Sequence, residues 1–508
     1  MRGGRSHNWW ETRAFAVAMM LAATVPLLWP PVPPLTDLPG HLGRYRVALD
    51  LASSPVLQQY YDFHWALVGN LGVDLLAMPL GRLIGLEPAV KLIVLLIPPL
   101  TIGGMLLLAR EIHGRIPPTA LLALPLAFSW PFQFGFVNYC LGLAAALYAA
   151  SLWLRLGRTG RTRIRAGIFL AVAVAVWLCH VMAWGVLGLT IYAFELIAAH
   201  RAGRSWPRSM LSAALACLPL ALPLVITAGW WSDGPGGVTG WPWGLLAKIL
   251  FVLAVLRNHS EAFDLLCILV IYVAVAFGLL RDHLRIEPRL GVAALLVFAA
   301  FAVMPNILLG AAYADMRLAP YAVILAVLAL EPTARLRFPL QKAIAIGAVA
   351  LFAARLTDQT LTYLRIDRIW SEQSAAADLL PRGARVFAMA AIECNTTWNS
   401  RRVHHLDGFA VARREAFTNG QWPMPGGQLL SVTYAPARGF DLDPSQLLWP
   451  SACEGEGLTL PFVIEHLPRH AFDYLWLIDL EPTREPHDPG LVPVWRGPDR
   501  GVLYRIVR

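Results

Sequence analysis

Residues 88–109 read PAVKLIVLLIPPLTIGGMLLLA, a run that contains a single charged side chain, Lys91. A helix needs about 20 mostly apolar residues to cross the hydrocarbon core of a bilayer, so this run predicts a membrane-spanning helix. Of the 508 residues, 57% are hydrophobic and 15% are charged, and the mean hydropathy is +0.54. Soluble domains carry about 25% charged residues. The composition therefore excludes one large soluble domain and predicts a polytopic α-helical membrane protein.

About eleven segments have the length and composition of membrane-spanning helices. They are 14–32, 88–109, 118–132, 135–154, 166–182, 183–199, 209–229, 260–280, 290–310, 318–333 and 338–356. The run 65–86 is also apolar, but it carries Asn70, Asp74 and Arg82. Short loops rich in arginine stay in the cytoplasm. The loop 155–165 holds five arginines. This loop and the N-terminus both lie in the cytoplasm only if the run 65–86 does not cross the membrane.

This topology predicts two regions with different surroundings. Residues 1–356 form the transmembrane domain, with a cytoplasmic N-terminus and a long first outer loop, 33–87, that carries amphipathic surface helices. Residues 357–508 form an extracytoplasmic domain. The net charge of +9 lies in short clusters between apolar runs, so membrane orientation explains it better than nucleic-acid binding does. Only three of the 42 basic residues are lysine, which favours a bacterial source and hence the inner membrane.

The tail is polar and is interrupted by Pro and Gly at short intervals. A helix is predicted over 358–380. Four strand-like stretches follow: ARVFAM (384–389), YLWLIDL (474–480), LVPVW (491–495) and GVLYRIV (501–507). This pattern predicts a small α/β domain. Cys394 and Cys453 also lie in the tail, and an oxidising compartment would allow a disulfide between them, although the spacing does not prove one.

Polar side chains gather at the predicted outer face of the membrane. They are Asp37, His41, Arg44, His64, Asn138, His180, Asp315 and Arg317. Ionisable groups at membrane depth are costly, so their placement is informative. The cytoplasmic loops contain little besides arginine. The asymmetry predicts a site at the outer membrane interface, covered by the tail.

The location of this site limits its chemistry. No Walker loop occurs in the sequence, so a donor at the outer face must already be activated, as a lipid phosphate or pyrophosphate is. Arginine binds such a headgroup, and a carboxylate can deprotonate an acceptor hydroxyl. Asp37 is the predicted catalytic residue. The alternative is that Asp37 caps a helix that begins near Pro39.

The other candidates have predicted roles around Asp37. Arg317, and also Arg44, would balance the charge of the phosphate, with Asp315 positioning Arg317. The sugar pocket would be shaped by His41, His64, Asn138 and His180. Each has an ordinary alternative: contact with lipid headgroups, a surface salt bridge or a helix cap.

These features together resemble the GT-C superfamily of integral membrane glycosyltransferases, over residues 10–360. The stretch 64–114 is similar to the surface helix and second span of its bacterial members, which include protein mannosyltransferases and the aminoarabinose transferase of lipid A. The resemblance implies a polyprenyl-phosphate-linked sugar as donor and an extracytoplasmic acceptor. It also implies that Asp37 is a base or a ligand of a divalent metal. The family often has two near-adjacent acids in this loop, whereas here Leu38 and Pro39 follow Asp37.

Two alternatives to a glycosyltransferase remain open at the level of sequence. One is a noncatalytic assembly partner of GT-C descent, because the second acid is missing. The other is a transporter or flippase of lipid-linked substrates, which would place polar residues in mid-span and often shows repeat symmetry. In this sequence the polar residues gather at the predicted outer face of the membrane, and the two halves of the chain do not resemble each other. The acceptor could be a protein, a lipid or a surface glycan.

The predicted sidedness can be tested with a phosphatase reporter, which is active only outside the cytoplasm. A fusion after Arg508 should be active, because an odd number of spans separates the tail from a cytoplasmic N-terminus. A fusion within the loop 155–165 should be inactive. The reverse pattern would invert the topology and place the polar residues on the cytoplasmic side.

Overall fold

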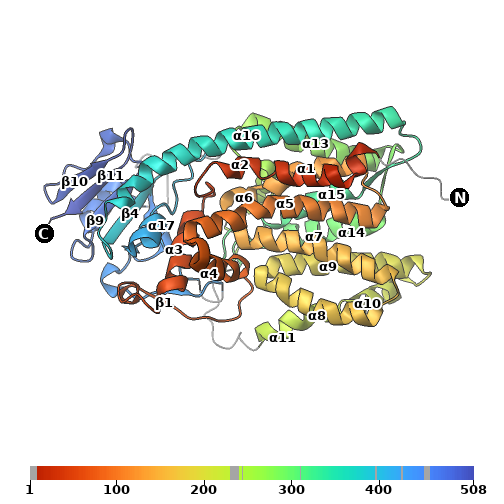
Figure 1. Cartoon of the computed structure of the whole chain (residues 1–508), viewed down its shortest axis with the longest axis horizontal. Helices are drawn as coiled ribbons and strands as arrows, with labels where there is room; N and C mark the ends of the chain where they lie inside the picture. The colour runs from red at the N-terminus through yellow and green to blue at the C-terminus, as the bar shows by residue number, and fades with distance from the viewer. Residues whose placement is uncertain are drawn as a thin grey trace.

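The computed structural model describes residues 8–228, 239–242, 244–308, 310–394, 398–424, 427–450 and 458–507. The chain is mostly helical. Its long helices run side by side along the long axis of the molecule, and a region of strands and short helices lies at one end (Figure 1). The described residues therefore form a helical bundle with a sheet-containing region at one end.

Six helices in the described part of the chain are long enough and apolar enough to cross a membrane. They are α5 (Leu86–His113), α7 (Val137–Arg158), α8 (Thr162–Cys179), α9 (Val181–Arg201), α13 (Glu261–Leu280) and α16 (Phe338–Asp378). A pair bent by 51°, Trp206–Ala216 with Leu218–Thr227, adds a seventh when it is taken as one span. Shorter apolar helices are α1 (Arg13–Ala22), α12 with η5 (Gly244–Leu256), α14 (Pro288–Val303) and α15 (Leu318–Leu328). A helical membrane protein is confirmed in outline, and eleven crossings stay a prediction.

One predicted span has a different helical form. The segment predicted over 118–132 is a 3-10 helix, η3 (Pro118–Phe128), and all of its residues are buried. Pro125 lies inside it, and proline lacks the N–H that an α-helical hydrogen bond needs. The tighter helix rises about 2 Å per residue, so it covers more distance with fewer residues.

Helix α16 joins the bundle to the sheet region. It has 41 residues, which at 1.5 Å per residue is about 60 Å, twice the roughly 30 Å of a hydrocarbon core. The last predicted span and the helix predicted over 358–380 are thus one helix, and the boundary between 356 and 357 lies inside it. Near its far end, Trp370 Nε1 donates to the carbonyl of Arg402 at 3.0 Å.

Most strands of the C-terminal region form one sheet, and it contains every predicted strand. Its order is β10 (Leu491–Arg496), β11 (Val502–Ile506), β9 (Tyr474–Ile478), β4 (Arg385–Ala391), β7 (Leu447–Trp449) and β8 (Leu458–Thr459), and β5 (Phe417–Thr418) also pairs with β4. Strands β9, β4, β7 and β8 are parallel, whereas β10 and β11 are antiparallel. The carboxyl ends of the parallel strands therefore meet at one edge. The predicted Cys394–Cys453 pair involves Cys453, which lies outside the described residues.

The first loop and the tail interlock. Helix α3 (Leu38–Asp50), predicted to lie on the membrane surface, is buried along much of its length because α17 (Gly408–Arg414) packs on it. A Cβ at Gly408 would lie 2.0 Å from the carbonyl oxygen of Pro39. Further along, β1 (Tyr61–Phe63) pairs with β6 (Leu430–Val432). The residues between the first and second spans thus share a core with the tail.

The arginine-rich loops lie at the end of the bundle away from the sheet (Figure 1). Arg158 pairs with Glu111 near the ends of α7 and α5. Arg201 Nη1 lies 3.6 Å from Glu287 Oε1, which joins the end of α9 to the start of α14. The charge pattern predicts this separation of the arginine loops from the polar site. The compartment that each end faces stays a prediction.

The contact between α3 and α17 should be sensitive to a single methyl group. Gly408→Ala would push Cβ into the backbone of Pro39, and overpacking of this kind costs about 1–3 kcal/mol. We expect a lower midpoint of thermal unfolding for the full chain in detergent. Gly347→Ala on α16 is the control, because a Cβ there meets nothing within 4 Å. Equal midpoints for the two variants would show that the contact is not tight.

Candidate active site

Asp37 lies at the start of α3 with its side chain free of the helix. It occupies the N-cap position, but its carboxylate makes no capping hydrogen bond. Its backbone N–H donates to the carbonyl of Phe134 at 2.9 Å. Gly135 has φ +101°, and a Cβ there would lie 2.9 Å from the nitrogen of Asp37. The loop at Gly135 thus holds the backbone of Asp37, and the helix-cap role of its side chain is not realised.

A histidine from the tail faces Asp37. His405 Nε2 lies 3.9 Å from Asp37 Oδ1, and these two side chains are 10% and 13% exposed. The other ring nitrogen, Nδ1, lies 3.3 Å from Asp443 Oδ1. The φ of His405 is +60°, a region that non-glycine residues enter mainly where the surroundings hold them. Gln446 Oε1 helps by accepting the backbone N–H of His405 at 3.1 Å. The tail therefore places an imidazole between two carboxylates.

Burial changes the acidity of Asp37. Removal of its carboxyl group from water raises its pKa from 3.8 to about 7, a rise that the charges of His405 and Arg317 oppose and that Asp443 reinforces. Burial disfavours the ionised form of a carboxyl group. A general base works best when its pKa lies near the working pH. Asp37 is therefore suited to take up a proton at neutral pH.

Aromatic rings form one wall of the site. The ring of Trp422 lies 4.4 Å from that of His405 and 5.3 Å from that of His41, centroid to centroid. Gly40 makes room for the indole, because a Cβ there would lie 2.3 Å from it. Burial, followed by the charges of Arg44 and His405, lowers the pKa of His41 well below 6.5. The imidazole of His41 is thus neutral at pH 7 and can hydrogen-bond to a hydroxyl group.

Arg317 is a buried cation with no acidic partner in the part of the chain that the structure describes. It is 8% exposed, and its Nη1 donates to the carbonyl of Ala312 at 2.8 Å. The guanidinium lies 3.8 Å from the centre of the Phe136 ring. Its Nε is buried without a hydrogen-bond partner among the same residues. The remaining N–H donors are available to an anion, and the charge acts on the pKa of Asp37.

Asp315 does not pair with Arg317, although the sequence predicts that it positions this arginine. Its Oδ2 lies 2.8 Å from Lys248 Nζ, and it accepts a hydrogen bond from Asn306 Nδ2 at 2.8 Å. Lys248 comes from α12, whose position the sequence does not reveal. Asp315 is thus part of a separate ion pair that fixes α12 to the start of α15.

Arg44 and Asn138 belong to a closed polar cluster. Arg44 Nη2 lies 3.0 Å from Asp74 Oδ1, and both side chains are 3% exposed. Asn138 Nδ2 donates to Asp74 Oδ2 at 3.0 Å and to Asn70 Oδ1 at 3.1 Å. The charge of Arg44 is therefore already balanced by Asp74. This cluster ties α3, α4 (Gly72–Ile84) and α7 together beside Asp37.

The two remaining predicted histidines differ in their placement. His180 lies against Tyr139 with 5.4 Å between ring centroids, and the hydroxyl of Tyr139 donates to the carbonyl of Arg317. His180 is therefore on the Arg317 side of the site. His64 is 82% exposed and contacts Asp62 Oδ2 at 2.6 Å. No described contact joins His64 to the cluster around Asp37.

The sequence alone does not single out Trp422 and Arg402. His405 belongs to the stretch VHHLDGF (403–409), in which His404, His405 and Asp407 could bind a metal or an acceptor, although an HHLD pattern alone is a weak signal. Arg402 Nη1 donates to the carbonyl of Pro34 at 2.8 Å and to Gln133 Oε1 at 3.0 Å. These bonds anchor the segment that carries His405 to the loops beside Asp37. Nothing in the sequence marks contacts between residues so far apart. The HHLD pattern was the one available signal, and it suggested a metal or acceptor site without a location.

The predicted divalent metal has no ready-made ligand set in the described ranges. Among those residues no group of three or more His, Cys, Asp and Glu side chains is arranged to hold a metal ion. His405 lies 3.9 Å from the carboxylate of Asp37, and Asp443 lies 3.3 Å from the other ring nitrogen of His405. Metal use therefore stays a prediction of the resemblance.

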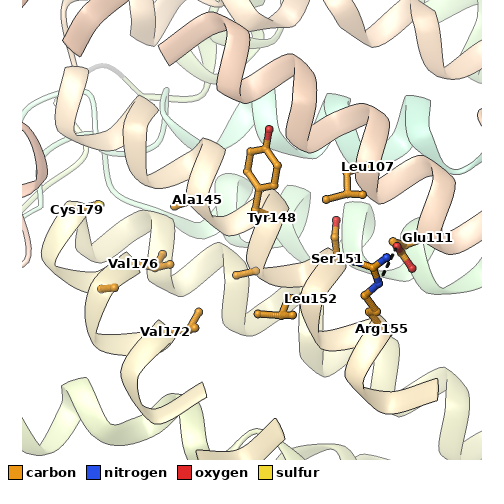
Figure 2. Close-up of a pocket in the computed structure, with 12 residues that line it drawn as sticks. Leu107, Glu111, Ala145, Tyr148, Ser151, Leu152, Arg155, Val172, Val176 and Cys179 are labelled. Atoms are coloured by element: carbon orange, nitrogen blue, oxygen red, sulfur yellow. Dashed lines mark ion pairs between the residues drawn. The ribbon is translucent and has the colours of Figure 1, made fainter. Parts of the chain in front are cut away.

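An apolar groove of about 450 Å³ leads away from this site between α5, α7 and α8 (Figure 2). Cys179 lies at one end of it, and the ion pair of Arg155 with Glu111 at the other. Most of its wall is aliphatic, including Leu107, Ala145, Leu152, Val172 and Val176. Because Cys179 directly precedes His180, the groove ends beside the His180–Tyr139 contact.

The solved structures that match this chain include two states of one protein. ArnT from Cupriavidus metallidurans bound to undecaprenyl phosphate matches with a TM-score of 0.48 and 13% identity, over 97% of this chain and 97% of that chain. Its apo state matches with a TM-score of 0.49 and 14% identity, again over 97% of both chains. No family model matches the sequence, and no curated protein matches it. A similarity at this level does not establish the chemistry of this chain, which depends on its own residues.

Proposed function

We propose that this protein is a membrane glycosyltransferase that moves a sugar from a polyprenyl-phosphate donor to a hydroxyl group of an extracytoplasmic acceptor. The observation that carries the proposal is the uncapped, buried carboxyl of Asp37. It faces the imidazole of His405 at 3.9 Å and lies in the field of Arg317, which has no acidic partner among the described residues. A base for a hydroxyl group and a cation for a phosphate are the two groups that such a transfer needs.

The proposed reaction is a direct displacement at the anomeric carbon of the sugar. The carboxylate of Asp37 takes the proton of the acceptor hydroxyl. The acceptor oxygen forms a bond to the anomeric carbon while the bond from that carbon to the phosphate oxygen breaks. The phosphate leaves with the bonding electrons, and Arg317 balances the charge that develops on it. His405 is a positioning residue that acts through Asp37.

The apolar groove supports a lipid-linked donor. One end of it is lined by Cys179, the residue before His180, and most of its wall is aliphatic. One polar group in its wall, Ser151 Oγ, is already bonded to the carbonyl of Leu147 within α7. An isoprenoid chain matches such a wall, and the phosphate at its head would reach the donors of Arg317. A headgroup moving along the groove would meet almost no partners, so the groove supports transfer at one face better than transport of the headgroup.

Replacement of Asp37 tests the proposal directly. Asp37→Asn keeps the shape of the side chain but removes the base, and we expect the turnover of a polyprenyl-phosphate sugar with cell-envelope acceptors to fall at least 10²–10⁴-fold. Release of the carrier phosphate measures turnover. Asp50→Asn, at the other end of α3, is the matched control and should keep full turnover. Full turnover in Asp37→Asn would refute the catalytic role. An inactive wild-type protein would favour the noncatalytic partner instead.

The pH dependence of turnover should report the ionisation of Asp37. Because burial raises its pKa to about 7, the base is protonated below that pH, and kcat should rise with pH through about 7. The charge of His405 holds this pKa down, so His405→Gln should move the rising limb to higher pH. A structural role for His405 would lower kcat at every pH without moving the limb.

A further inference from the structure

A second cavity, of about 300 Å³, lies at the carboxyl edge of the C-terminal sheet. Ile392 follows β4 there, and Asp479 follows β9. The opposite wall comes from α16 and from the residue His259, just before α13. Open α/β sheets bind their ligands outside the carboxyl ends of parallel strands. The position of this cavity is therefore one at which ligand binding is expected.

The lining of the cavity has more basic than acidic side chains. The basic ones are Arg365, Arg401, Arg484, Arg500, His259 and His404, and the acidic ones are Glu393, Asp479 and Glu481. Arg401 Nε lies 2.7 Å from Asp479 Oδ2, and Arg500 Nη2 lies 2.6 Å from Glu481 Oε1. Arg365 and Arg484 have no acidic partner among the residues that the structure describes. Two guanidinium groups thus remain for a ligand.

The surroundings of Arg365 point to an anion as this ligand. Its Nη1 contacts Nε2 of His259, and Arg365 forms no ion pair with an acid among the described residues. Burial, followed by the charge of His405, lowers the pKa of His404 to about 4. His404 is thus neutral at pH 7, and the positive charge of the cavity belongs to its arginines. Guanidinium groups bind phosphate and carboxylate groups in a bidentate manner.

The strand end that borders the cavity is strained. Asp479 has φ +57° and is 2% exposed. Its Oδ1 is buried without a hydrogen-bond partner in the described ranges, while its Oδ2 holds Arg401 in the wall. A residue in this backbone region costs about 1–3 kcal/mol, and such residues cluster at ligand sites. An unpartnered buried oxygen at the edge of a basic cavity can also accept a hydrogen bond from a ligand hydroxyl group.

The cavity is adjacent to the candidate active site. His404 lines the cavity, and the next residue, His405, faces Asp37 at 3.9 Å. The rings of His404 and His405 lie 6.5 Å apart, centroid to centroid, so this dipeptide separates the cavity from the carboxyl of Asp37. The groove that would take the donor lipid ends instead on the His180 side of the site.

We propose that this cavity binds the acid group, phosphate or carboxylate, of an anionic glycan that serves as the acceptor. The role of this glycan as acceptor rests on the proposed transferase function, whereas the binding of an anionic sugar does not. Arg365 and Arg484 hold the acid group, and the neutral part of the glycan extends past His404 toward Asp37. The guanidinium pair thus selects acceptors by charge, at a place separate from the base.

The experiment uses the full chain in detergent with three small probes: glucose 6-phosphate, glucuronate and glucose. Dissociation constants come from the shift of the thermal-unfolding midpoint with probe concentration. At least one of the two anionic sugars should raise the midpoint, and the tighter of them identifies the acid group. Glucose should not raise it at the same concentrations. Equal stabilisation by glucose would overturn the proposal.

Variants locate the binding. Arg484→Gln and Arg365→Gln should each raise the Kd of the anionic sugar about tenfold, which corresponds to about 1.4 kcal/mol. Arg505→Gln is the matched control, because Arg505 is exposed on β11 outside the cavity. Arg317→Gln should also leave this Kd unchanged, which separates the cavity from the donor phosphate. An unchanged Kd in both cavity variants, or a loss in Arg317→Gln alone, would overturn the proposal.

The same variants separate this proposal from the transferase function. If the anionic sugar binds through Arg365 and Arg484 but no transfer occurs, the anion site is supported and the transferase function fails. If transfer depends on Asp37 but neither cavity variant raises the KM of an anionic acceptor over a neutral one, the anion site fails and the transferase function is supported.

Discussion

The close approach of two backbone segments, the start of α3 at Pro39 and the start of α17 at Gly408, is the constraint on which the site depends. No side chain at position 408 could allow it, since a Cβ would lie 2.0 Å from the carbonyl oxygen of Pro39. Asp37 lies just before one segment and His405 just before the other. The contact therefore sets the distance between the carboxylate and the imidazole, and the β1–β6 pairing secures it further along the chain.

Hydrophobic runs and strand-like stretches predicted most of the fold, because both follow from local composition. The helices α5, α7, α8 and α9 and the main strands lie close to their predicted ranges. Local patterns could not show that proline turns one span into the 3-10 helix η3. They also could not show that the tail buries α3. These features depend on contacts between distant parts of the chain. The hydrophobic periodicity of a segment gives no information about such contacts.

The candidate site illustrates the same limit with two arginines that look alike in sequence. Both are predicted to lie at the outer face of the membrane. Arg44 meets Asp74 from α4 and becomes part of a neutral, buried cluster, whereas Arg317 meets a carbonyl group and the ring of Phe136. A buried cation without an acidic partner is costly. The phosphate of the proposed donor would supply the missing negative charge, and spacing along the chain cannot distinguish the two cases.

The charges around Asp37 also determine when it can act as a base. Arg317 and His405 both hold the pKa of Asp37 down against the effect of burial. A phosphate bound to Arg317 would cancel much of that pull and add a negative charge of its own, so the pKa of Asp37 would rise further. A carboxylate whose pKa rises on donor binding becomes a stronger base for the acceptor hydroxyl. At a fixed pH near 7 the same rise leaves a smaller fraction of Asp37 ionised. Donor binding would therefore exchange ionised fraction for base strength, and the charge of His405, which holds the pKa of Asp37 down, would limit the loss of ionised carboxylate.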